Sequence, residues 1–251
     1  MCKSSNKFRL SVWWMLFLFF SVAFYASPAA AQDKKAQQLA QKAIQQMGGK
    51  QGWANTRFIA WSFRDQYQVW DKKADHYRWE KDSLVAIVST RTKNGKVYVA
   101  GKELLNREEK RKLLDKAYAA WINNSYWLVM PFKLHDPGVR LKYIGEGKTM
   151  DGAAASILQM TFANVGLTPE NKYHLWIDKK SGLVTQWAYF KNFNDKTPTF
   201  TRRWADYKNF GAIKLASDRS NPESDFTLEN IATPKQVPAS VFYSPRPIRK
   251  L

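Results

Sequence analysis

The stretch YHLWIDKKSGLVTQWAY, residues 173–189, indicates the fold of this chain. Apolar residues recur at every second position on both sides of a polar turn, DKKSG, at residues 178–182. Period-two alternation is typical of a β-strand with one buried face, and Asp and Gly are common in tight turns. The stretch therefore predicts two antiparallel strands joined as a hairpin.

The same alternation recurs along most of the chain. Residues 57–99 contain about five short strands, and Asn94-Gly95 between two apolar runs is a strong hairpin signal. Further strands are expected within residues 139–162, within residues 200–217 and near residues 226–231. The total is about eleven strands, and the sequence shows no solenoid repeat, low-complexity tract or interdomain linker.

Two segments have a helical period instead. Residues 36–47 place apolar side chains on one stripe, and Gly48-Gly49 ends this helix. Residues 107–122 carry a second stripe, which follows a capping-box pattern that begins at Asn106. This helix leads into SYWLVMPF, residues 125–132, a run too apolar to face water.

These elements predict a mainly β fold with helices, of the α+β class. Consecutive strands with tight turns build a single curved antiparallel sheet, or incomplete β-barrel. The N-terminal helix and the helical insertion have to bury their apolar stripes, so we expect them to cap the concave face, the insertion as a lid. The tail at residues 234–251 contains four prolines and is expected to run as extended coil.

The N-terminus has the pattern of a cleavable signal peptide. A basic segment precedes an apolar run at residues 10–25, about 16 residues, which is shorter than the roughly 20 needed to span a bilayer. Three alanines then supply the small residues of a cleavage site after Ala31. We expect residues 1–31 to be removed and residues 32–251 to fold as one domain in the periplasm. An uncleaved membrane anchor is the alternative.

Cysteine usage and charge exclude several kinds of site. Cys2 is the only cysteine, so the expected mature chain has no disulfide, thiolate metal site or cysteine nucleophile. The leader holds three of the 40 Lys and Arg and none of the 21 acidic residues, which leaves a net charge of +16. In an exported chain this dispersed charge argues against nucleic acid. It favours either a solubilising surface or attraction to anionic lipid headgroups.

No catalytic or metal site is indicated. His76, His135 and His174 are the only histidines, and none has metal-ligand spacing. His76 and His174 are expected to be exposed on strands, and His135 to lie in a turn. Acidic pairs such as Asp65 and Asp71 have no fixed separation, so a glycosidase site is not predicted. We expect no enzyme activity, no metal and no cofactor.

Three motifs resemble the superfamily of LolA-like and LolB-like periplasmic lipoprotein carriers. The opening helix ends in Gly48-Gly49 before Trp53, residues 175–183 resemble the family's Trp-Ile-Asp, turn, Gly-Leu hairpin, and residues 241–245 resemble its late Phe-then-Pro ending. The segment 121–134 is similar to that of uncharacterised relatives. The resemblance covers nearly the whole mature chain and implies an incomplete β-barrel, closed by helices, around a hydrophobic cavity for acyl chains.

Aromatic residues are the most prominent feature of the composition. Nine tryptophans remain after the leader, several of them on strand faces. A half-barrel either fills its concavity with side chains or holds a ligand there, so both a solid core and a lined cavity are open. The residues expected to line a cavity are Trp61, Phe63, Trp79, Trp127, Met130 and Trp187.

Together these patterns predict a monomeric periplasmic carrier that holds a lipid, or the acyl chains of a lipoprotein, under a helical lid. Its expected partners are a lipid or an acylated protein, with an anionic membrane surface as a further one and no nucleic acid. Two other hypotheses stay open. One is an envelope enzyme acting on a glycan or acidic substrate, and the other is a non-catalytic module that docks on an envelope partner.

Overall fold

The structure, a computed structural model, describes residue 1 and residues 28–251. Most of the expected leader therefore lies outside the described residues. The helices are α1 (Pro28–Gln46), α2 (Gly49–Asn55), α3 (Arg107–Val129) and the 3-10 turns η1 (Met130–Lys133) and η2 (Ala239–Phe242). The helix predicted at residues 36–47 is confirmed within α1.

The strands form three hydrogen-bonded antiparallel sheets. The first has the order β14-β1-β2-β3-β4-β5-β6, the second β11-β10-β9-β8-β7, and the third pairs β12 with β13. The bounds of the first are β1 (Phe58–Phe63), β2 (Gln66–Asp71), β3 (His76–Lys81), β4 (Leu84–Ser89), β5 (Gly95–Val99), β6 (Lys102–Glu103) and β14 (Glu229–Ala232). Those of the others are β7 (Val139–Lys148), β8 (Ala154–Phe162), β9 (Lys172–Asp178), β10 (Val184–Phe190), β11 (Phe200–Arg203), β12 (Ala205–Phe210) and β13 (Ile213–Asp218).

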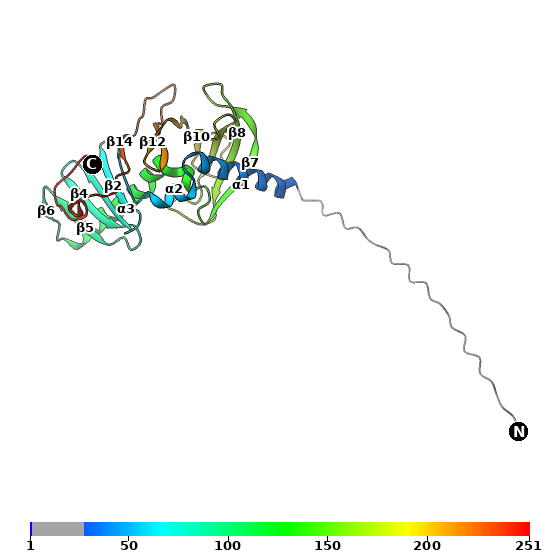
Figure 1. The fold of residues 1–251 in the computed structure, drawn as a ribbon. Helices are drawn as coiled ribbons and strands as arrows, with labels where there is room; N and C mark the ends of the chain where they lie inside the picture. Colours follow the sequence, from blue (N-terminus) through cyan, green and yellow to red (C-terminus); the bar gives the residue numbers. More distant parts are fainter. Residues whose placement is uncertain (2–27) are drawn as a thin grey trace.

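Hydrogen bonds between the sheets join them into one curved surface. The amide of Trp204, between β11 and β12, donates to the carbonyl of Thr185 on β10 at 2.9 Å. The amide of Leu228, just before β14, donates to the carbonyl of Ser217 on β13 at 2.9 Å. Figure 1 shows β4, β5 and β6 of the first sheet at one end of the molecule and β7 and β8 of the second at the other, with β12 between them.

The fold class predicted from the sequence is confirmed. The sheets are antiparallel and open, because β6 and β7 end the strand order without pairing to each other within residues 28–251. The number of strands is fourteen in this part of the chain rather than about eleven. The difference comes mainly from β6, a strand of only two residues, and from the run expected near residue 200, which divides into β11 and β12.

The main hydrophobic core lies between the concave face of the sheet and the helices. Helix α1 packs against β7, and α3 contacts β3, β4 and β5 at one end of the molecule and β13 near its middle. Strands β1 to β4 are buried on both faces, with all six residues of β1 buried. Another part of the chain therefore packs on their convex face as well.

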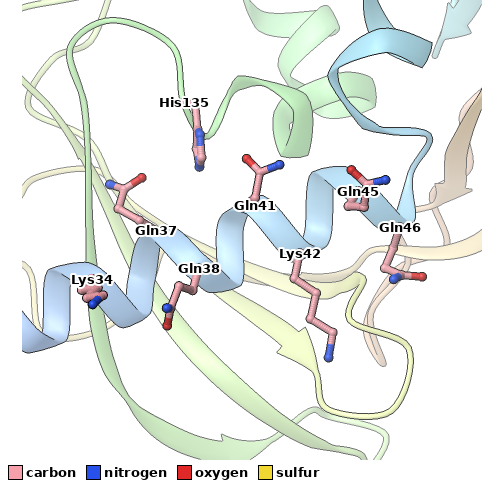
Figure 2. A pocket seen from close by; sticks show the side chains of 8 residues that line it. All are labelled: Lys34, Gln37, Gln38, Gln41, Lys42, Gln45, Gln46 and His135. Atoms are coloured by element: carbon pink, nitrogen blue, oxygen red, sulfur yellow. The ribbon is translucent and has the colours of Figure 1, made fainter.

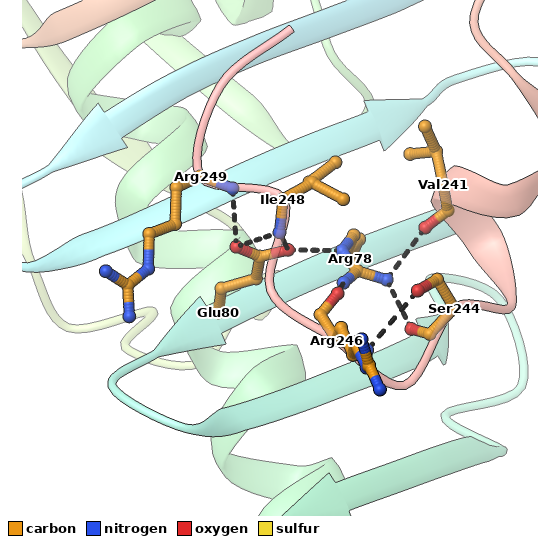
Figure 3. A network of polar contacts seen from close by, with 7 residues as sticks. All are labelled: Arg78, Glu80, Val241, Ser244, Arg246, Ile248 and Arg249. Atoms are coloured by element: carbon orange, nitrogen blue, oxygen red, sulfur yellow. Dashed lines mark hydrogen bonds and ion pairs between the residues drawn. The ribbon is translucent and has the colours of Figure 1, made fainter. Parts of the chain in front are cut away.

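The cover is the C-terminal tail, which the sequence predicts only as extended coil. It contains η2 and packs apolar side chains, including Val241 and Ile248, against the convex face of the sheet. Arg78 and Glu80 of β3 hold it through its backbone, and their own ion pair measures 2.5 Å (Figure 3). The bonded groups are the carbonyls of Val241, Ser244 and Arg246 for Arg78, and the amides of Ile248 and Arg249 for Glu80.

Candidate ligand-binding site

Helix α3 crosses the concave side of the sheet, as the predicted lid does. It begins where expected, because the Asn106 side chain accepts from the Glu109 amide at 3.0 Å. It extends further than the predicted 107–122, so the apolar run that follows is the last helical turns plus η1. The most apolar part of the segment is thereby placed against the sheet.

Trp127, near the end of α3, packs against both of the larger sheets. Its ring lies 5.7 Å from that of Phe63 on β1 and 4.9 Å from that of Trp187 on β10. Phe200 and Phe226 complete the group, with ring centroids 5.5 and 5.4 Å from Trp127. These are edge-on or tilted arrangements in the range that aromatic pairs favour. The lid therefore rests on an aromatic cluster, defined by these five residues, that connects the two larger sheets.

All six residues predicted to line a cavity belong to the main core. Five are buried and Trp127 is partly buried. The structure brings Phe63, Trp127 and Trp187 into direct contact. Trp61 packs against the ring of Tyr77 instead, at 6.3 Å, and the Trp79 indole donates to the Gln66 side chain at 2.7 Å. Met130 is fully buried at the start of η1.

The core is unusual in its unpaired polar atoms. Within residues 28–251, several indole N–H groups are buried without a hydrogen-bond acceptor. Such a donor destabilises a protein by about 1–3 kcal/mol, so each one in a native core needs an explanation. Those in or against the main core belong to Trp61, Trp70, Trp121, Trp187 and Trp204.

Arg219 is a buried charge beneath the lid, and sequence reasoning missed it. Its side chain is fully buried, and its guanidinium lies 3.5 Å from the centre of the Trp204 ring. It donates to the carbonyls of Trp127, Ala216 and Asp218 at 2.9, 3.1 and 2.7 Å. Burial lowers the pKa of Arg219 to about 9, so the group remains charged at neutral pH.

Few polar contacts hold the lid to the sheet. Asn124 donates to the Gln66 side chain at 2.9 Å, and the Tyr126 hydroxyl contacts the Met160 sulfur at 3.9 Å. The remaining attachment near the end of α3 is apolar packing together with the bond from Arg219. Apolar packing is not directional, so the apolar groups of a ligand can take the place of these contacts.

Two hollows lie on the outer surface. One, of about 620 Å³, follows the polar face of α1, where Gln37 and Gln41 lie on the side of the turn that carries His135 and Lys42 points away from it (Figure 2). The other, of about 360 Å³, lies beside the β1–β2 and β3–β4 turns. Neither hollow is lined by any of the six predicted cavity residues, which are packed into the core.

The histidines lie apart from this site. His76 is exposed and His135 lies in a turn, both as predicted. His174 is partly buried rather than exposed, because its ring packs 4.5 Å from that of Phe190. Over the described ranges, no three His, Cys, Asp or Glu side chains are grouped to hold a metal ion. Among the described helices, none combines the length and apolar character that crossing a membrane requires.

Comparison with known proteins gives a family and two solved structures. The model of a family of unknown function, DUF6503, matches residues 15–222, and no curated protein matches. A DUF1329 family protein from Desulfovibrio piger is 11% identical with a TM-score of 0.46, over 84% of this chain and 97% of that one. MucB, solved in complex with MucA(peri), is 13% identical with a TM-score of 0.24, over 81% of this chain and 60% of that one. TM-scores this low identify no function.

Proposed function

The chain belongs to DUF6503, a family of unknown function, and from its site we propose that it binds a long acyl chain between helix α3 and the concave face of the sheet. The observation that carries the proposal is the aromatic cluster around Trp127. The apolar end of α3 packs there on rings from both larger sheets, and few hydrogen bonds hold it to them.

An acyl chain would replace the contacts that α3 makes with these rings. Burying a large apolar side chain contributes about 1.5–3 kcal/mol, and a methylene group contributes roughly 0.8 kcal/mol. A chain of a dozen methylenes can therefore replace the contacts that α3 gives up when it moves off the sheet. Since α3 packs against both larger sheets, its displacement would open the concavity along its length.

The unpaired indole donors support a ligand that carries oxygen atoms. A purely hydrocarbon core would gain from phenylalanine at these positions, because phenylalanine has no donor to bury. Ester or carboxyl oxygens on a ligand would accept from the indoles of Trp187 or Trp204. The site is thus suited to an acylated molecule more than to a plain hydrocarbon.

The resemblance to lipoprotein carriers supports the same ligand class. On this reading the protein is a non-catalytic periplasmic carrier, exported by its leader, whose partner is a lipid or an acylated protein. Its positive charge would favour approach to anionic membrane surfaces, where each nearby basic residue adds about 1 kcal/mol. The envelope enzyme and the docking module remain the competing hypotheses.

Titration with a fluorescent fatty acid tests the proposal. The chain should bind the probe, and Trp61→Ala or Trp187→Ala should weaken binding by about 1.5–3 kcal/mol, roughly 10- to 150-fold. Tyr243→Ala is the matched control, because this residue on the tail is 63% exposed and its loss should leave the affinity for the probe unchanged. If the wild type binds no apolar probe, the aromatics are solid core and the proposal fails.

A further inference from the structure

Arg219 has no anionic partner within the described residues. No carboxylate lies within ion-pair distance of its guanidinium. The neighbouring Asp218 carboxylate instead accepts from the Ser220 amide at 2.7 Å. Tyr207, which is also close, donates its hydroxyl to the Val184 carbonyl. The groups bonded to the guanidinium are therefore neutral, and the Asp218 carboxylate acts on its charge only from beyond ion-pair distance.

Neutral carbonyls only partly compensate this charge. A guanidinium has five N–H groups, and three of those of Arg219 are bonded. Burying an unpaired ion destabilises a protein by several kcal/mol even after relaxation. A buried arginine with two free donors, at the place where the lid meets the sheet, is consequently suited to an anion.

The ring stacked on the guanidinium and the ring next to it carry two further unpaired donors. The rings of Trp187 and Trp204 are 5.3 Å apart at 87°, and Trp204 stacks under the guanidinium. Both indole N–H groups are buried and unpaired in this part of the chain. Trp187 is also a member of the aromatic cluster under Trp127. The donors thus adjoin the position proposed for the acyl chain.

We propose that Arg219, Trp187 and Trp204 form a subsite for an anionic oxygen group, a carboxylate or a phosphate, at the end of the acyl ligand. The inference rests on the proposed function and narrows its ligand class. Arg219 would supply the charge and two donors in a planar fork, and the indoles would each supply one donor. An esterified, uncharged end would leave the charge of Arg219 without a partner.

Displacement of a neutral apolar dye, 1-N-phenylnaphthylamine, separates the two proposals. Dye binding alone reports the apolar site. Myristate, a monoacylglycerol phosphate with the same chain and methyl myristate are then compared as competitors on the full chain. We expect at least one anion to displace the dye at a concentration about ten-fold or more below that of the ester. The stronger anion identifies the source as a carboxylate or a phosphate.

Variants assign that preference to the subsite. Arg219→Met should bind the dye and lose the preference for the anion, and Trp204→Phe, which keeps an aromatic ring, should reduce it. Lys180→Ala, an exposed charge removed elsewhere, should leave the preference intact. Equal displacement by the anions and the ester in the wild type overturns the subsite while dye binding upholds the carrier. This comparison in the wild type tests the subsite even if Arg219→Met does not fold.

Discussion

Arg219 supplies the hydrogen bond that Pro131 cannot give to the carbonyl of Trp127. In an α-helix this carbonyl would accept from the amide four residues on, but proline has no N–H. The Arg219 Nε atom takes that place at 2.9 Å, and its charge lies at the helix C-terminus, where the helix dipole favours a cation. The end of β13 thereby fixes the end of the lid.

This relationship predicts an energetic coupling between the two positions. Arg219→Met deprives the Trp127 carbonyl of its donor, which lowers the free energy of unfolding by about 1–3 kcal/mol, while removal of the buried unpaired charge acts in the opposite direction. Pro131→Ala offers a replacement N–H, so the double variant should be less destabilised than the sum by roughly 1 kcal/mol. Urea denaturation measures the cycle. Arg111→Met, at a 71% exposed side chain on α3, should show no coupling with Pro131→Ala.

Covalent closure of the lid should block ligand binding. Gln66 and Asn124 are in contact through their side chains, so a short bifunctional thiol reagent should join Gln66→Cys to Asn124→Cys in a Cys2→Ser background. Without the reagent this variant should bind the fluorescent fatty acid. After crosslinking, binding should fall at least ten-fold. Unchanged affinity in the crosslinked protein would show that ligands do not enter beneath α3.

Loss of the Arg78–Glu80 pair should release the tail. Glu80→Gln leaves the buried Arg78 charge without its partner, which for such pairs lowers stability by about 3–5 kcal/mol. Hydrogen exchange should rise first over residues 241–249. Glu103→Gln breaks an exposed 3.5 Å contact with Lys96 and should change stability by no more than about 1 kcal/mol. Similar effects of both substitutions would contradict a structural role for the buried pair.

Partial burial of His174 should make stability depend on pH. Burial, and secondarily the charge of Lys172, lowers the pKa of His174 to about 4, against about 6.5 in the unfolded chain. Between these values the unfolded state binds the proton and the folded state does not. The free energy of unfolding should therefore fall as pH drops from 6.5 to 4. His174→Phe should remove this part of the pH dependence, and His76→Phe, at an exposed histidine, should retain it.

Processing after Ala31 is a separate prediction. The exported form should begin at Gln32, which N-terminal sequencing of the periplasmic fraction measures. Cleavage would remove residues 28–31 of α1 and leave residues 32–46 of the helix that packs on β7. Recovery of intact Met1 in the membrane fraction would contradict both cleavage and export as a free protein.

Periodicity was sufficient to predict most of the elements. The hairpin at residues 173–189 is β9 and β10, and the hairpin signalled by Asn94-Gly95 is β4 and β5. The local role of Gly95 differs from the prediction, however. It pairs with Val88 inside the ladder, and a Cβ there would lie 2.0 Å from the Ile87 carbonyl oxygen. The glycine is needed for close approach of two strands rather than for the turn.

The parts that sequence reasoning missed depend on distant neighbours. Arg219 lies 92 positions from Trp127, and no local pattern marks it as buried. Pro131, four residues after Trp127, was the available signal, because it leaves a helix carbonyl without a donor. The alternation of Trp61 and Phe63 on β1 identifies a face that meets the interior. It does not tell whether other side chains or a ligand fill the space opposite.

The contacts of β3 with the tail also bear on when this chain can fold. Arg78 bonds to residues 163 to 168 positions later in the sequence. While a ribosome is still making residues 241–249, the outer side of β1 to β4 stays uncovered and its charged pair lacks its backbone partners. Such distant contacts slow folding, because much chain must be ordered before they form. For the predicted export as an unfolded chain this delay is an advantage, because the chain would reach the far side of the membrane before its structure is complete.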